Sequence, residues 1–132
     1  MQPGNSLIKK IGFYILFSVY FSGGLNHFMM PELYLPLIPP YLIFLKELNW
    51  LSGGAEFILA VALLFKVSRK LACFGIITVL LAFLPAHVYF IEMGSCISNS
   101  ICFDPWVAWV RLIVIHPFLI YWAFAYRNYS LK

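Results

Sequence analysis

Five ionisable side chains lie inside long apolar stretches of this sequence, where charged or titratable groups are unusual. They are His27, Glu56, His87, Arg111 and His116. An ionisable group in an apolar medium is costly, so each needs a partner, a water-filled cavity or a function. Imidazole donates, accepts and titrates near neutral pH, and a carboxyl group can exchange protons with it. The set is therefore typical of a proton relay or a polar ligand site, with Glu56 and His87 as catalytic candidates.

Glu56 and Arg111 carry the opposite charges of this set. An unpaired charge at such a position is strongly unfavourable, so we expect the two side chains to be in contact. The simpler interpretation is that the pair only fixes which helix packs on which, and that each histidine is an interhelical hydrogen bonder. The alternative is a ligand pocket. Its expected lining residues are His27, Glu56, His87, Trp109, Arg111 and His116.

The elements that must position these residues are membrane helices. With 63% hydrophobic and 11% charged residues in 132, the chain is too apolar for a soluble domain of this length. Four apolar runs, at residues 7–29, 48–65, 71–91 and 106–126, are long enough to span a bilayer. We predict a single domain over residues 1–132, an all-α bundle of four transmembrane helices surrounded by the lipid bilayer.

The connection between the first two runs is apolar but rich in proline. Four prolines occur within ten residues after Met30, and no continuous spanning helix tolerates that density. We expect an interfacial or re-entrant segment that folds back over the bundle. Pro85 and Pro117 lie within the third and fourth runs, where we expect kinks beside His87 and His116.

The distribution of charges predicts the orientation. One side holds Lys9, Lys10, Lys66, Arg69, Lys70, Arg127 and Lys132, and the other holds Glu32, Lys46, Glu47, Glu92 and Asp104. Cytoplasmic loops retain Lys and Arg, so both termini are expected in the cytoplasm, with the protein in a bacterial inner membrane. The first run is long and lacks a typical cleavage site, which favours a helix over a signal peptide. Basic residues in short clusters between apolar runs do not predict nucleic-acid binding.

The polar residues then share one depth near the outer surface, which predicts a pocket that opens outward. Cys96 and Cys102 fall in the outer loop between the third and fourth runs. A disulfide, a reactive dithiol and free thiols all remain open for this pair. The sequence contains no H-x-x-x-H or E-x-x-H spacing on one helix, so we expect no metal.

Several short motifs, taken in their order and spacing, resemble the DoxX-like family of small four-helix membrane proteins. They are Asn26-His27-Phe28 before Pro31, Ile38 to Leu42, Ser52 to Glu56, Phe83 to His87, and Trp109 to Leu112. The likeness runs from about Gly12 to Tyr126. It differs at His87, where relatives also carry Asn, and at His116, where Gln is common. The resemblance implies the four-helix fold.

Its implications for function are diverse. Some family members look like the small membrane subunit of thiosulfate:quinone oxidoreductase, and others take part in oxidative-stress complexes. Animal relatives are similar to a receptor-assembly chaperone of the endoplasmic reticulum. The leading prediction is a pocket for a quinone or another small lipophilic molecule in a membrane redox system, with electrons from a partner subunit. The alternative is a non-catalytic assembly factor or chaperone for membrane proteins, and whether the chain is an enzyme or a homo-oligomer stays open.

Overall fold

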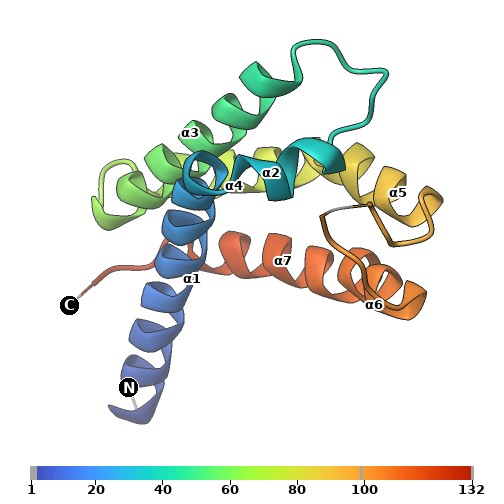
Figure 1. Ribbon diagram of the computed structural model, residues 1–132. Coiled ribbons are helices and arrows are strands. Elements are labelled where there is room, and N and C mark those ends of the chain that lie inside the picture. Colours follow the sequence, from blue (N-terminus) through green and yellow to red (C-terminus); the bar gives the residue numbers. More distant parts are fainter. Residues whose placement is uncertain (1–2, 99, 132) are drawn as a thin grey trace.

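The computed structural model describes residues 3–98 and 100–131, which are helical apart from their connections (Figure 1). The elements are α1 (Pro3–Met29), α2 (Pro31–Tyr34), the short 3-10 helix η1 (Leu35–Leu37), α3 (Leu45–Leu64), α4 (Arg69–Ala82), α5 (Leu84–Glu92), α6 (Pro105–Val110), the π-helical turn η2 (Arg111–Ile115) and α7 (His116–Tyr126). No strand occurs in this part of the chain. Lys132, one of the charges used to predict the orientation, lies outside the described residues.

Three helical segments are long and apolar enough to cross a membrane. They are Leu45–Leu64, Arg69–Glu92 and Pro105–Tyr126, and they confirm an all-helical protein of membrane character. Helix α1 is longer, with 27 residues, but Lys9, Lys10, Asn26 and His27 make it more polar. Whether α1 is a fourth crossing therefore belongs to the proposal below.

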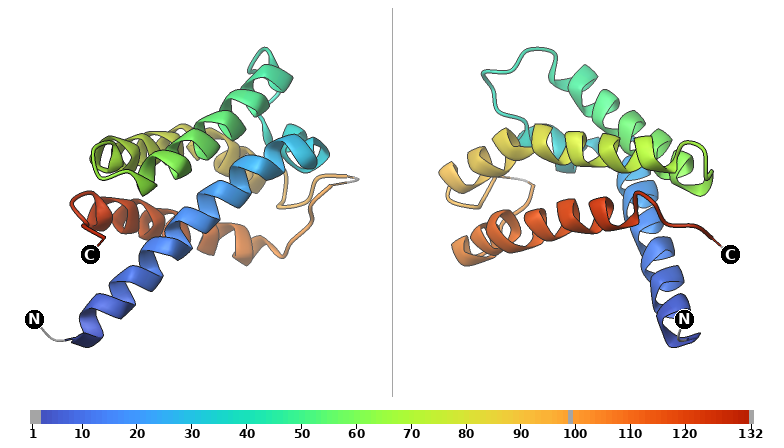
Figure 2. Two further views of the ribbon diagram at one scale, coloured as in Figure 1. Left: turned by 90° about the vertical axis from the view of Figure 1, so that its left-hand side faces the viewer. Right: turned by 180° about the vertical axis from the view of Figure 1, so that it is seen from behind.

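The helices run between two ends of the molecule (Figure 2). The turn between α3 and α4 and both ends of the described chain lie at one end, and residues 31–44 and the α5–α6 connection lie at the other. Helix α1 crosses the other helices obliquely, and its first turns extend beyond them. The buried apolar core lies between α1, α3, α4 and α7. It consists of Phe13, Leu16, Tyr20, Ala60, Leu63, Ala72, Cys73, Ile76, Leu80 and Ala123.

Glycines bring α1 and α3 into close backbone contact. A Cβ atom on Gly24 would lie 2.6 Å from the backbone nitrogen of Phe57 and 2.8 Å from the carbonyl oxygen of Gly53. A Cβ atom on Gly53 would lie 2.9 Å from the carbonyl oxygen of Gly24. Small residues permit such an approach between helices in lipid, where tight packing replaces the hydrophobic effect as the main attraction. The crossing point fixes which side chains of α3 face α1.

Prolines interrupt the third and fourth apolar runs, as expected. Helix α4 ends at Ala82 and α5 begins at Leu84, with Pro85 in its first turn. Pro117 lies in the first turn of α7, directly after the π-helical turn η2. Proline has no N–H to donate to the carbonyl four residues earlier, so the helix must break or widen at these points. Both irregularities lie beside histidines of the predicted site.

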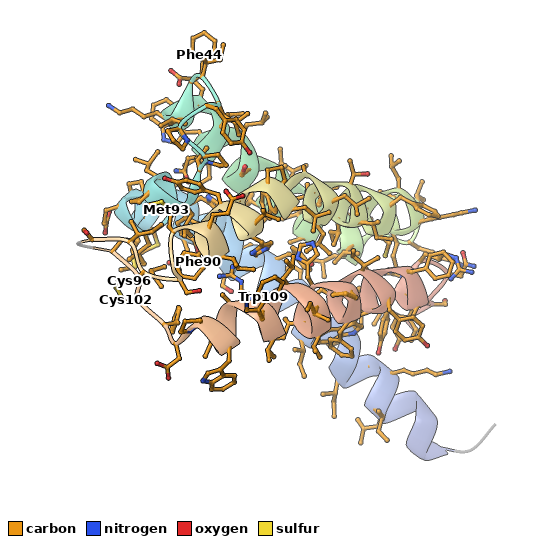
Figure 3. All side chains as sticks on the ribbon, turned by 90° about the vertical axis from the view of Figure 1, so that its right-hand side faces the viewer. Phe44, Phe90, Met93, Cys96, Cys102 and Trp109 are labelled. Carbon is orange, nitrogen blue, oxygen red and sulfur yellow. A yellow bond between two sulfur atoms is a disulfide. The ribbon has the colours of Figure 1, made fainter. Side chains whose placement is uncertain are left out.

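The proline-rich segment folds back over the bundle. Its first part forms α2 and η1, and η1 packs against α5 and α3. The segment then passes through an exposed loop that ends at Phe44, labelled at the tip in Figure 3. Phe44 has a φ of 60°, a left-handed conformation that non-glycine residues rarely adopt. This fold-back places the residues after Met30 at the end of the bundle opposite the α3–α4 turn.

Arg69 closes the opposite end of the bundle. Its Nε donates to the carbonyl oxygen of Leu63 at 2.7 Å, and its Nη2 donates to that of Leu64 at 3.1 Å. Its Nη1 donates to the carbonyl oxygen of Tyr129 at 2.6 Å, and the guanidinium lies 4.9 Å from the centre of the Phe13 ring. The last carbonyls of a helix have no partner within it, and the planar guanidinium satisfies them. Arg69 therefore has a structural role besides its contribution to the charge distribution.

A disulfide joins Cys96 to Cys102 in the α5–α6 connection (Figure 3). The backbone N–H of Ile97 donates to the carbonyl oxygen of Ile101 at 2.9 Å, and that of Phe103 donates to Ser95 at 2.9 Å. Of the three states left open by the sequence, the structure contains the bonded one. The remaining cysteine, Cys73, is a buried free thiol in α4.

Candidate functional site

One cavity of about 580 Å³ lies between the helices and the folded-back segment. Helices α1, α3, α4, α5 and α7 contribute to it, together with residues of the 31–44 segment and of η2. Most of its lining is aliphatic or aromatic. The polar exceptions are Tyr20, Tyr34, Ser52, Glu56, His87, Arg111 and His116. A largely apolar pocket with a few convergent polar groups is the usual form of a small-molecule site.

Glu56 is the acidic residue of this lining. It lies on α3 and is only 8% exposed. Its Oε2 atom rests against Gly23 of α1, where an added Cβ would come within 2.7 Å. Among the described residues, no side chain or backbone group hydrogen-bonds to this carboxyl group. A buried carboxyl group without a protein partner is unusual, because the loss of hydration is not repaid.

Tyr20 provides a second unpaired polar atom beside the cavity. Its side chain is 4% exposed, and its hydroxyl group is buried without a hydrogen-bond partner in the described part of the protein. Tyr20 precedes Gly23 by three residues on α1, so the two residues lie on the same face of the helix. Tyr20 and Glu56 therefore border one side of the cavity, and the hydroxyl group of Tyr20 is buried away from the open space.

Arg111 lines the cavity from the π-helical turn η2. The expected ion pair with Glu56 is wrong, because no nitrogen of Arg111 approaches an oxygen of Glu56 within 4.0 Å. The tight crossing of α1 and α3 holds the Glu56 carboxyl group against Gly23 instead. Arg111 is exposed while it also lines the cavity, so the cavity opens beside it. The two charged groups thus border one space without neutralising each other directly.

His87 and His116 lie side by side in the cavity wall. Their ring centres are 4.8 Å apart and the rings are nearly perpendicular, at 75°. The Nε2 atom of His116 lies 2.8 Å from the carbonyl oxygen of Leu80. A carbonyl oxygen only accepts, so Nε2 carries the proton and Nδ1 of the neutral ring is an acceptor. His87 has no hydrogen bond to another described residue, which leaves its imidazole available to a ligand.

His27 lies outside the cavity, contrary to the expected pocket. Its Nδ1 lies 2.7 Å from Oδ1 of Asn49, and Nδ2 of Asn49 donates to the carbonyl oxygen of His27 at 2.8 Å. The ring stacks on Tyr34 with the centres 3.8 Å apart. The side chain of Asn49 therefore hydrogen-bonds to both the ring and the backbone carbonyl oxygen of His27 at the α1–α3 contact. His27 is a satisfied interhelical hydrogen bonder rather than a ligand-binding residue.

Trp109 also lies outside the cavity, which corrects the expected lining. Its side chain is 49% exposed on α6. Side chains two positions apart in a helix point to nearly opposite faces, so Trp109 cannot share the direction of Arg111. Its place near the end of the fourth run favours the aromatic belt that commonly marks a membrane interface. The residues that the structure does bring to the cavity are Glu56, His87, Arg111 and His116.

Two tyrosines that line the cavity have weaker signals in the sequence. Tyr20 could be assigned to a pocket or to an aromatic belt, and its three-residue spacing from Gly23 is the feature that favours the pocket. Tyr34 follows the first proline of the folded-back segment. Its position became clear only from the path of that segment, because no helical periodicity extends across the prolines.

The combined arrangement can bind a molecule with a polar end and an apolar body. Arg111 and His87 offer donors, and Glu56 offers an acceptor. In the described residues, no group of three His, Cys, Asp or Glu side chains is placed to hold a metal ion. The polar groups lie among aliphatic walls from five helices, where hydrogen bonds are stronger than in water.

The chain belongs to the family described as Domain of unknown function (DUF8561), whose family model matches residues 16–127. The matched residues include every polar residue of the cavity lining. No curated protein and no solved structure matches the chain. The resemblance to the DoxX-like family stays a prediction.

Proposed function

We propose that this protein binds a small lipophilic molecule with a polar head, most simply a quinone, in the cavity between its helices. The observation that carries the proposal is the placement of Glu56. Its side chain is only 8% exposed and lines the cavity, and its carboxyl group has no hydrogen-bond partner among the described residues. Buried polar groups normally have partners, so a ligand that supplies them would explain the arrangement.

The size and lining of the cavity support this proposal. Pockets for small molecules usually have volumes of about 300–1,000 Å³, and this one has about 580 Å³. A quinone ring needs donors for its carbonyl oxygens and an apolar channel for its tail. Arg111 and His87 provide the donors, while Leu37, Ile38 and Leu42 of the folded-back segment provide apolar wall.

We propose further that the bound molecule belongs to a membrane redox system, with a partner subunit that exchanges electrons with it. The support is the motif resemblance to a family with quinone-linked members. The rival function, an assembly factor or chaperone, predicts a closed polar cluster that serves helix packing alone. An open cavity bordered by unpaired groups favours ligand binding over that rival.

The same proposal places four helices across the membrane, with both termini in the cytoplasm of a bacterial cell. The length of α1 and its close contact with α3 support a fourth crossing. The arrangement in Figure 2 is compatible with this orientation, since the two ends of the described chain lie at the end that also carries Lys66, Arg69 and Lys70.

The test is mass spectrometry of lipophilic molecules extracted from the gently purified protein. Wild type is compared with Glu56→Gln and Arg111→Gln variants that elute and melt as folded protein. A discrete molecule that co-purifies with wild type and is depleted in both variants supports the pocket. The matched control is Glu47→Gln, an exposed acidic residue on the same helix as Glu56.

If wild type and variants all carry only bulk phospholipid, the binding function is rejected. The next experiment is then cross-linking in native membranes to identify protein partners, as the assembly-factor function requires. If a quinone is recovered, single-turnover reduction with candidate donor proteins tests the redox part of the proposal separately.

A further inference from the structure

We infer that His116 is the positioning residue of the cavity, and that it holds Arg111 and His87 where both donate to acceptor oxygens on the head of the ligand. The inference rests on the proposed binding function and specifies the class of ligand. A lipophile whose head carries carbonyl oxygens, such as a quinone, fits it. A lipophile with the same tail and an unsubstituted ring does not.

The backbone of His116 is tied to Arg111. The N–H group of His116 donates to the carbonyl oxygen of Arg111, five residues earlier, which is the bond of a π-helical turn. In a regular α-helix, residues five positions apart are separated by about 140° around the axis. The wider turn reduces this angle, and Arg111 and His116 both line the cavity. Pro117 follows directly and has no N–H to donate to the carbonyl oxygen of Ile113, as a regular α-helix would require.

The side chain of His116 is tied to the third apolar run. The residue is only 4% exposed, and its Nε2 donates to the carbonyl oxygen of Leu80 in the last turn of α4 at 2.8 Å. The ring also packs edge-on against that of His87 in α5, with the ring centres 4.8 Å apart. One buried side chain therefore contacts both sides of the break between α4 and α5, while its backbone holds the turn that carries Arg111.

The two residues that His116 positions keep their donors free. Arg111 and His87 line the cavity, and neither side chain forms a hydrogen bond or an ion pair with another described residue. The positive charge of Arg111 acts on the rings of both His87 and His116, which places the three groups at one wall. A guanidinium carries five N–H donors and no acceptor, and a neutral imidazole carries one N–H. This wall therefore matches a head group that accepts hydrogen bonds, whatever the ionisation state of Glu56.

The experiment compares two probes, decylbenzoquinone and decylbenzene. They share a six-membered ring and a tail, and they differ in the two carbonyl oxygens. Each is equilibrated with protein in lipid nanodiscs and with empty nanodiscs, which correct for partition into lipid, and the retained probe is quantified by mass spectrometry. We expect wild type to bind decylbenzoquinone at least about tenfold more tightly than decylbenzene, a preference that one hydrogen bond from a charged group is sufficient to produce.

Variants of His116 separate positioning from packing. His116→Phe keeps a ring beside His87 but cannot donate to Leu80, and should reduce the preference for decylbenzoquinone to about threefold or less while decylbenzene binding stays unchanged. His116→Gln restores an N–H donor at a similar reach and should recover a preference of at least about fivefold. Tyr121→Phe, at an exposed position of α7, is the matched control and should behave as wild type.

Pro117→Ala tests the backbone connection and keeps the test valid if His116→Phe fails to fold. Alanine supplies the missing N–H and favours a regular α-helical turn, which should not destabilise the helix. Arg111 then turns away from His116, and the preference for decylbenzoquinone should fall to about threefold or less, as expected when a hydrogen bond to a charged group is lost.

The possible failures have different meanings. Equal binding of the two probes by wild type overturns the inference but leaves the lipophile pocket standing. Retention of both probes at the level of empty nanodiscs overturns the proposed binding function, and the inference with it. A preference that stays at the wild-type level in His116→Phe or Pro117→Ala overturns the positioning role. A parallel loss of both probes in His116→Phe that His116→Gln does not reverse also overturns it, because packing alone then explains the residue.

Discussion

His27 and Asn49 form a reciprocal pair that fixes the contact between α1 and α3. The Nδ1 atom of His27 lies 2.7 Å from Oδ1 of Asn49, and Nδ2 of Asn49 donates to the carbonyl oxygen of His27 at 2.8 Å. The second bond sets the orientation of the amide, because a carbonyl oxygen can only accept. The Oδ1 atom must then accept a hydrogen bond from His27, so the neutral imidazole carries its hydrogen on Nδ1.

The first prediction concerns this pair. Asn49→Ala leaves a buried N–H and a buried carbonyl oxygen without partners, and should reduce the free energy of unfolding by about 1–3 kcal/mol. Because His27 lines no part of the cavity, ligand retained per folded molecule should stay at the wild-type level. Thermal unfolding in nanodiscs and extraction of bound lipophiles measure the two quantities. His27→Ala should add little to Asn49→Ala in the double variant, and full additivity would contradict the pairing.

The second prediction compares three glycines of the same helix pair. Gly23→Ala places a methyl group 2.7 Å from Oε2 of Glu56, so the carboxyl group must move and ligand binding should fall several-fold with little change in stability. Gly24→Ala meets backbone atoms of α3 at 2.6 and 2.8 Å and should separate the helices, with a cost of about 1–3 kcal/mol.

Gly54→Ala is the matched control for both, because nothing lies within 4 Å of its added Cβ. Ligand retention and melting temperature, measured for all three variants, separate an effect on the site from an effect on packing. Equal behaviour of Gly23→Ala and Gly54→Ala would contradict the placement of Glu56.

The sequence predicted the membrane character and four of the seven polar residues of the cavity lining, because both depend on local patterns. Apolar runs of spanning length identify helices, and ionisable residues within them identify positions such as Glu56 and His87. Contacts between helices were harder to predict. The expected pairing of Glu56 with Arg111 followed from charge alone, whereas the backbone approach at Gly24 decides where the carboxyl group lies. Hydrophobicity carries no information on that crossing.

Two other residues, His27 and Trp109, were wrongly expected to line the cavity. His27 appeared equivalent to His87 in the sequence, because nothing local predicts that Asn49 of another helix pairs with it. Trp109 was grouped with Arg111 although two positions separate them on a helix, a spacing that directs side chains apart. Arg69 was counted only as a topology signal, since nothing local reveals that its guanidinium would meet Tyr129.

The third prediction tests the structural role of Arg69. Arg69→Lys keeps the positive charge but cannot reproduce three hydrogen bonds from a planar group to Leu63, Leu64 and Tyr129. We expect a loss of about 2–4 kcal/mol in the free energy of unfolding and faster hydrogen exchange at residues 127–131. Lys70→Arg is the control, because Lys70 is exposed and the substitution keeps the positive charge of the same cluster. Unchanged exchange at the C-terminal residues would contradict the cap.

The fourth prediction tests the proposed orientation through the disulfide. After mild reduction, the exposed Cys96 and Cys102 should react with a membrane-impermeant maleimide added outside intact spheroplasts. Cys73 is buried in α4 and should stay unlabelled. In a Cys96→Ser, Cys102→Ser background, Lys66→Cys should label only after permeabilisation, because Lys66 lies at the turn between α3 and α4. Labelling of Lys66→Cys in intact spheroplasts would contradict the proposed orientation. The basic cluster would then lie outside, against the usual retention of Lys and Arg in the cytoplasm.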